Sequence, residues 1–140
     1  MLFRSLEPPD PASIVATVDP AQIGQALTNL VLNALQATRE GGSVELRVAL
    51  GPGSPPGVLP PAPRPCACIS VRDEGPGIAG EQVQQLFDPF FTTKDVGEGT
   101  GLGLSVAHGI VNENRGWIEV RSAPGVGSRF SIWLPGEPSA

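Results

Sequence analysis

The sequence has no tyrosine, a single histidine, only two cysteines and no long hydrophobic run, and each shortage excludes a class of protein. Cys66 and Cys68 stand two apart with no second pair, a spacing that supports neither a zinc site nor a disulfide on one strand face. We expect both to be ordinary reduced cysteines. No apolar stretch approaches the ~20 residues of a membrane span, and the first residues lack the apolar core of a signal peptide. The sequence therefore predicts a cytoplasmic domain.

Positive charge is also scarce. The chain has 9 Lys and Arg against 14 Asp and Glu, a formal net charge of −5, and the basic residues form no run. Nucleic-acid binding normally requires a basic patch, so we expect no nucleic-acid partner. A length of 140 residues suits one domain.

Hydrophobic periodicity predicts the secondary structure. Period-two patterns and turn residues predict strands over 13–18, 43–50, 66–72, 116–122 and 128–135. Helices are predicted over 19–38, 80–87 and 102–114. The predicted buried faces of the two long helices are Ile23, Leu27, Leu30, Val31 and Ala34 in the first, and Val106, Ala107, Ile110 and Val111 in the second. The element order indicates an α+β fold, a two-layer α/β sandwich whose mixed sheet carries helices on one face.

Proline is clustered, and one cluster lies inside the predicted domain. We expect residues 1–12 to be a starting segment or linker, 13–135 the domain, and 136–140 a tail. Within the domain, "GPGSPPGVLPPAPRP" (51–65) is predicted to be a long, mobile loop between two strands. Proline offers no donor to a sheet interior, and we interpret this loop as a solvated insertion.

The most unusual stretch is "GEGTGLGL" (97–104), with a glycine at every second position. Its spacing does not fit G-x-G-x-x-G, it follows no predicted strand, and the chain has no Gly-Lys-Ser/Thr. The stretch leads instead into a predicted helix, whose first N–H groups and positive dipole end favour phosphate.

A second candidate site lies in "TNLVLNALQA". Asn29 and Asn33 are four residues apart, hence on one face of the predicted helix. Carboxamide oxygens suit Mg²⁺, a cation usually held by few protein groups together with phosphates and water. The alternative is that both side chains merely solvate the helix.

A third candidate is "VRDEGPGI". Asp73 has the parity of Ile69 and Val71, which places its carboxylate at the rim of the core face, where it could accept from a ring amine. Gly75 and Gly77 would let the backbone approach a flat ligand closely. The alternative is an ordinary turn.

In this order, the motifs resemble the catalytic and ATP-binding domain of bacterial sensor histidine kinases, in the GHKL ATPase superfamily, over about 13–135. "NLVLNALQA" resembles the N box, "DEGPGI" the first glycine box, "LFDPFFTTK" the F box and "GEGTGLGLS" the second glycine box. "GWIEVRSAPGVGSRFSIWLP" is similar to the closing hairpin. The resemblance implies a Bergerat-type fold with an ATP lid over 87–101.

The resemblance also implies roles for individual residues. Asn33 would ligate Mg²⁺, Asp73 would accept from the adenine amino group with support from Ser128, and Lys94 would reach the phosphates. Asn29 and Lys94 are the implied catalytic residues, and Phe87, Phe90 and Phe91 an apolar hinge. The full implied ATP-binding set is Asn29, Asn33, Asp73, Gly75, Gly77, Ile78, Lys94, Gly99, Thr100, Gly101, Leu102, Gly103, Leu104 and Ser128.

The residue types also bear on the reaction. Related chaperones and topoisomerases carry a water-activating Glu where this chain has Asn29, so hydrolysis is poorly supported. Phosphoryl transfer, which depends mostly on positioning and charge, requires less of the domain. His108 lies within a predicted helix and lacks an acidic neighbour, so we interpret it as structural. The resemblance therefore implies transfer to a histidine on a dimerisation domain outside this chain, and then to a response regulator receiver domain. The parent protein could be attached to a membrane.

Two alternatives stay open at this point. One is a serine kinase of the anti-sigma type, which shares the N and glycine boxes. The other is a non-catalytic module that binds nucleotide in order to dock a partner.

Overall fold

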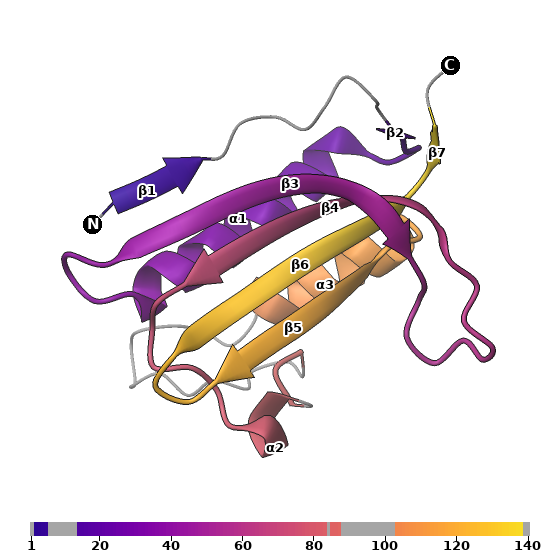
Figure 1. The fold of residues 1–140 in the computed structure, drawn as a ribbon. Helices are drawn as coiled ribbons and strands as arrows, with labels where there is room; N and C mark the ends of the chain where they lie inside the picture. Colours follow the sequence, from indigo (N-terminus) through magenta and orange to yellow (C-terminus); the bar gives the residue numbers. More distant parts are fainter. Residues whose placement is uncertain (1, 6–13, 84, 88–102, 139–140) are drawn as a thin grey trace.

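The computed structural model describes residues 2–5, 14–83, 85–87 and 103–138, and shows two layers (Figure 1). One layer is a five-stranded sheet in the order β1-β3-β4-β6-β5, and helices α1 and α3 lie together against one of its faces. This arrangement confirms the predicted α+β sandwich with helices on one face.

The sheet is built mainly from two long antiparallel hairpins. β3 (Ser43–Gly53) pairs with β4 (Arg64–Asp73), β4 pairs with β6 (Gly127–Pro135), and β6 pairs with β5 (Trp117–Ala123), all antiparallel. β1 (Leu2–Ser5) joins the edge of β3 in parallel, which makes the sheet mixed as predicted.

Local sequence explains where α1 (Pro20–Ala37) begins and ends. The Asp19 carboxylate accepts from the backbone N–H groups of Ala21 and Gln22 at 3.0 and 3.2 Å, and Pro20 occupies the first turn. At the other end, the Ala34 carbonyl accepts from both the backbone N–H of Thr38 at 3.0 Å and the Thr38 hydroxyl at 2.8 Å, so Thr38 closes the last turn.

The core lies between the sheet and these two helices. α1 buries Ile23, Ala26, Leu30 and Ala34, and α3 (Gly103–Glu113) buries Ala107 and Val111. They pack against buried strand residues that include Val44, Val71, Phe130 and Ile132. Leu27, Val31 and Ile110 of the predicted stripes are partly buried, whereas Val106 is 39% exposed and was wrongly assigned to the core.

Two predicted elements are shorter than expected. The helix predicted over 80–87 is only α2 (Gly80–Val83), and the strand predicted over 13–18 is only β2 (Ile14–Val15). β2 pairs not with the large sheet but with β7 (Glu137–Pro138), in a separate two-stranded sheet. A short apolar run shows that a segment is extended, but it does not specify the strand with which it pairs.

The segments expected to be irregular contribute strands. Leu2–Ser5, expected to be linker, form β1, and Glu137–Pro138, expected to be tail, form β7. The predicted loop 51–65 is shorter at both ends, since β3 continues to Gly53 and β4 starts at Arg64. Pro52 and Pro65 face each other near the loop end of this hairpin, where few ladder donors are needed.

Candidate nucleotide-binding site

One row of residues crosses the sheet at the end nearest the chain reversal after β4. Asp73 lies opposite Val44 of β3 on one side and Ser128 of β6 on the other, and Ser128 lies opposite Ser122 of β5. Residues directly opposite in a sheet point to the same face, so all four side chains share the helix-covered face. The predicted place of Asp73 at the rim of the core is therefore where the structure puts it.

The Asp73 carboxylate is nearly enclosed, with 2% of the residue exposed. Its Oδ1 accepts from the backbone N–H of Gly75 at 2.8 Å, a local turn bond that Asp commonly makes. Burial raises the pKa of this carboxyl, while the backbone N–H groups of Gly75 and Ser128 act to lower it. A buried acceptor is thus held at the edge of the site at some cost to folding.

The glycine loop after Asp73 is packed onto the turn between β5 and β6. Gly77 has φ +75°, and a Cβ there would run into the carbonyl of Ala123. The Gly125 N–H also donates to the Pro76 carbonyl at 2.7 Å. Only glycine allows both this conformation and this approach, so Gly77 lets the loop pack onto the turn.

Sequence reasoning missed Ser122. Its hydroxyl accepts from the backbone N–H of Ile78 at 2.8 Å, lies 3.1 Å from the Gly127 carbonyl, and is 2.7 Å from the Ser128 hydroxyl. The period-two pattern of β5 could have indicated it, because Ser122 has the same parity as the core residues Ile118 and Val120. Asp73, Ser128 and Ser122 form a polar row across the sheet. Ser122 links this row to the glycine loop, which includes the predicted site residue Ile78.

The two helices meet at the other part of the site. The Asn29 side-chain amide on α1 donates to the carbonyl of Gly103, the first residue of α3, at 3.3 Å. Asn33 lies one turn further along α1, and both asparagines are half-buried. The structure therefore brings the N box beside the start of the helix that follows the glycine run. The first N–H groups of a helix have no partner within it and favour anions.

The remaining predicted site residues divide into two groups. Leu104 lies in the first turn of α3, and its side chain packs partly buried against the core. Lys94, Gly99, Thr100, Gly101 and Leu102, with Phe90 and Phe91, lie outside the described residues. Phe87 is described, and its ring stacks on His108 with centroids 4.6 Å apart.

A search of known families places the chain. The model of the histidine kinase-, DNA gyrase B- and HSP90-like ATPases matches residues 18–138. The chain belongs to this ATPase family. The match confirms an ATP-binding domain, and together with the relatives and solved structures below it confirms the resemblance to the catalytic domain of sensor histidine kinases.

Relatives of this ATPase domain with curated names are sensor kinases. The chain is 44% identical over 117 residues to sensor histidine kinase ZraS of Escherichia coli O157:H7, covering 84% of this chain and 22% of ZraS. It is 41% identical over 120 residues to sensor kinase CckA of Brucella abortus (strain 2308), covering 84% of this chain and 13% of CckA. The chain thus spans less than a quarter of the length of these relatives.

Solved structures agree with the family. The mycobacterial sensor histidine kinase MprB superposes with a TM-score of 0.73 at 25% identity, covering 99% of this chain and 83% of that one. The catalytic domain of histidine kinase ThkA gives a TM-score of 0.67 at 31% identity, covering 96% and 77%.

ATPases of this family usually use Mg²⁺. The described residues fit a Mg²⁺ site in which the bound nucleotide supplies some of the ligands. Among them, no group of three or more His, Cys, Asp and Glu could hold a metal ion by itself. The carboxamide oxygens of Asn33 and Asn29 are neutral oxygen ligands suited to a cation whose charge is balanced by phosphates. These residues suit a Mg²⁺ that arrives with ATP.

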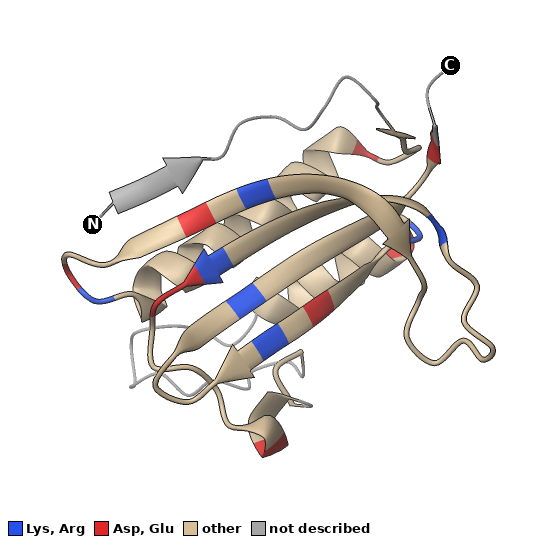
Figure 2. Ribbon diagram, in the orientation of Figure 1, with Lys and Arg blue, Asp and Glu red and all other residues tan. Residues whose placement is uncertain are grey.

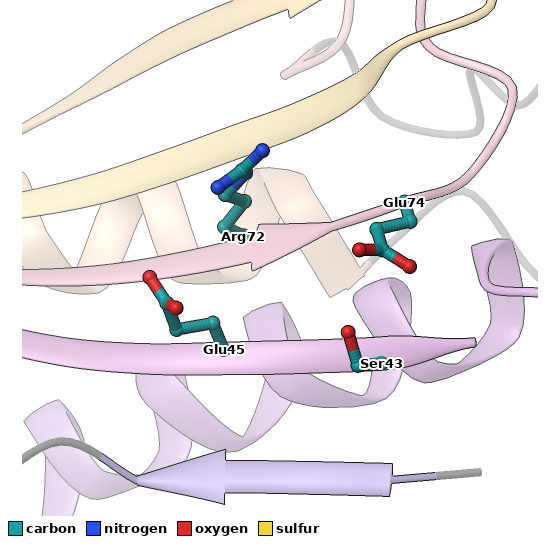
Figure 3. A pocket seen from close by; sticks show the side chains of 4 residues that line it. All are labelled: Ser43, Glu45, Arg72 and Glu74. Atoms are coloured by element: carbon teal, nitrogen blue, oxygen red, sulfur yellow. The ribbon is translucent and has the colours of Figure 1, made fainter.

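The opposite face of the sheet has a different character. Figure 2 shows basic and acidic positions along β3 to β6, and Arg47 pairs with Glu45 at 3.7 Å and Arg121 with Glu119 at 3.3 Å. Side chains alternate along a strand, and these four have the opposite parity to Val44 and Ser122, so they point to the face without helices. A small polar hollow there is lined by Ser43, Glu45, Arg72 and Glu74 (Figure 3). These residues alternate with Val44 and Asp73 along their strands, so the hollow lies away from the polar row.

Cys66 and Cys68 are both free, as expected, and burial raises the pKa of each thiol. Within the described part of the chain, no helix has the length and apolar character to cross a bilayer.

Proposed function

We propose that this domain binds ATP between the polar row and the start of α3, and transfers its γ-phosphoryl group to a histidine of a dimerisation domain elsewhere in a sensor kinase. The observation that carries the proposal is the buried Asp73 carboxylate beside the glycine loop, on the same sheet face as the Asn29–Gly103 contact. The sensor kinases among the relatives support the same reaction.

At the base end, Asp73 accepts a hydrogen bond from the exocyclic amino group of adenine. Its enclosure supports this role, because a charged acceptor held away from water discriminates strongly between donors and acceptors. Gly75, Gly77 and Ile78 form the backbone wall beside it, and Ser128 flanks it in register.

At the phosphate end, the N–H groups of Gly103 and Leu104 face the anion together with the positive end of the α3 dipole. Asn33, with Asn29 beside it, holds Mg²⁺, which when bound neutralises charge on the phosphates. Lys94 and the backbone of Gly99, Thr100, Gly101 and Leu102 are proposed to complete this end.

The chain's own groups suit transfer better than hydrolysis. Asn29 has no carboxylate with which to activate water, and its amide nitrogen is engaged with the Gly103 carbonyl. Since an imidazole is already nucleophilic, the domain needs only to position ATP and stabilise charge. The phosphorylated histidine would then pass its phosphoryl group to the receiver domain of a response regulator.

Transfer in trans tests the proposal. The domain is mixed with radiolabelled ATP, Mg²⁺ and a separately made acceptor hairpin of its own kinase. We expect label on the hairpin that is stable in base and lost in acid, as a phosphohistidine is. Acid-stable label would indicate a serine kinase instead, and absence of label despite ATP binding would contradict the proposal in favour of a non-catalytic module. Calorimetry with Asp73→Asn and Asn33→Ala provides the binding controls.

A further inference from the structure

Ser122 occupies a position from which it controls the direction of a hydrogen bond at the base end of the site. It lies in the polar row on β5, opposite Ser128 and one strand further from Asp73. Three contacts converge on its hydroxyl oxygen: the Ile78 N–H at 2.8 Å, the Gly127 carbonyl at 3.1 Å and the Ser128 hydroxyl at 2.7 Å.

Only one placement of the hydroxyl hydrogens provides a hydrogen for each of the three contacts of Ser122. A serine hydroxyl has one hydrogen to donate and two lone pairs to accept with. The Ile78 N–H can only donate, and the Gly127 carbonyl can only accept, so Ser122 accepts from the first and donates to the second. If Ser122 instead donated to Ser128, the contact with the Gly127 carbonyl would be left without a hydrogen.

The direction of the remaining bond follows. Two hydroxyl oxygens 2.7 Å apart are at the usual O–H···O distance and need a hydrogen between them. Because the Ser122 hydrogen is already directed at Gly127, Ser128 is the donor. Ser128 is 7% exposed, so water offers its hydroxyl little alternative. Its oxygen then has only lone pairs left for a ligand.

Asp73 and Ser128 therefore form a pair of neighbouring acceptors. An ionised carboxylate only accepts, and the Ser128 oxygen has no hydrogen left to offer. A group that approaches both must donate. The amino group of adenine does so, whereas the keto oxygen at the same ring position in a hypoxanthine or guanine base would face two acceptors with no hydrogen between them.

We propose that Ser122 is a specificity-determining residue, which fixes Ser128 as a hydrogen-bond acceptor and so makes this site select a 6-amino purine over a 6-keto purine. This inference rests on the proposed binding of adenine at Asp73. Ser122 acts through Ser128 and through the Ile78 loop, so it is a positioning residue and touches no reacting atom.

The test compares ATP with ITP, in which the amino group is replaced by a keto oxygen. Dissociation constants for both nucleotides are measured by calorimetry with Mg²⁺ on the whole chain. In Ser122→Ala, the loss of the Ile78 contact weakens both nucleotides. The ITP-to-ATP ratio of dissociation constants also falls, by about two- to tenfold, the range for one hydrogen bond. The ratio falls because the Ser128 hydroxyl becomes free to turn and donate to the keto oxygen.

A double-mutant cycle separates this route from general loosening. With Ser128→Ala already present, adding Ser122→Ala is expected to leave the ratio unchanged. Ser131→Ala removes another buried serine of β6 that points to the opposite sheet face, and is expected to keep the wild-type ratio. If Ser122→Ala fails to fold, Ser122→Thr and Ser122→Val provide the comparison, since they differ only in the hydroxyl, and Thr should keep the ratio.

The outcomes are distinguishable. A Ser122→Ala protein that binds ATP with the wild-type ratio, or additive changes in the cycle, would overturn the role of Ser122 and leave the proposed function intact. A wild-type protein that binds no ATP, or an Asp73→Asn variant that binds it normally, would instead contradict the proposed site itself.

Discussion

The side-chain amide of Asn29 donates to the backbone carbonyl of Gly103 at 3.3 Å, across 74 positions of sequence. The bond joins the middle of α1 to the first residue of α3. The bond thereby sets the position of the first turn of α3 relative to Asn33, which lies one turn away on α1. That first turn is the one proposed to face the phosphates. This contact therefore links the proposed metal ligand on α1 to the proposed phosphate-facing end of α3.

Removing this contact should impair the reaction more than the fold. We expect Asn29→Ala to lower phosphotransfer about 10- to 100-fold, the scale of a small misplacement of reacting groups. The melting temperature should change little, because the bond is partly exposed. Gln25→Ala, an exposed residue of the same helix, is the matched control and should retain activity. Equal activity of the two variants would contradict the positioning role.

Asp73→Asn should raise the stability of the fold and lower its affinity for ATP. Because burial raises the pKa of Asp73, the folded protein binds this proton more tightly than the unfolded chain does. The group's contribution to stability is therefore lost as pH rises through the raised pKa, and recovered as pH falls through it. At neutral pH, Asp73→Asn should unfold at a higher temperature than wild type while losing ATP affinity. The difference in stability should narrow in acid.

Thermal unfolding of both proteins at several pH values, without nucleotide, measures this difference. A gap that widened in acid would have the wrong sign for a buried carboxylate whose pKa is raised.

Gly77→Ala should disturb the base end of the site. The new Cβ would demand φ +75° from an L-residue and would meet the Ala123 carbonyl. We expect a loss of about 1–3 kcal/mol in the free energy of unfolding, together with weaker ATP binding. Gly80→Ala is the control, because a Cβ there meets nothing within 4 Å and the residue begins α2. Urea unfolding should find that control unchanged or more stable.

Asn114→Ala should weaken the fold without weakening nucleotide selectivity. The Asn114 side chain accepts from the Asp19 N–H at 2.8 Å and donates to Gln22 and to the Ile110 carbonyl, which joins the end of α3 to the start of α1. The expected cost is about 1–3 kcal/mol for unsatisfied polar groups. Asn112→Ala, an exposed neighbour on α3, should cost much less in the same urea titration. A lower ITP-to-ATP ratio of dissociation constants in Asn114→Ala would contradict this expectation, because it would show that the Asn114 contacts between α1 and α3 also shape the nucleotide site.

The elements that the sequence predicted well are those with their own local signals. The cap at Asp19 and the apolar face of α1 depend on residues that are close together in sequence. The alternation of side chains along β4 was enough to place Asp73 at the rim of the core. Four short boxes in order predicted the ATPase domain. The strands β1, β2 and β7 were missed or misjudged, because their pairing partners lie far away in the chain.

What the sequence determined by itself was the fold class and the family, since each depends on local patterns and on their order along the chain. Only the tertiary structure decided how Ser122, Ser128 and Asp73 line up, and that Asn114 clamps two helices. Strand register and helix docking are settled by packing between distant segments, and the direction of a hydroxyl's single proton is settled by whichever partners that packing brings within reach.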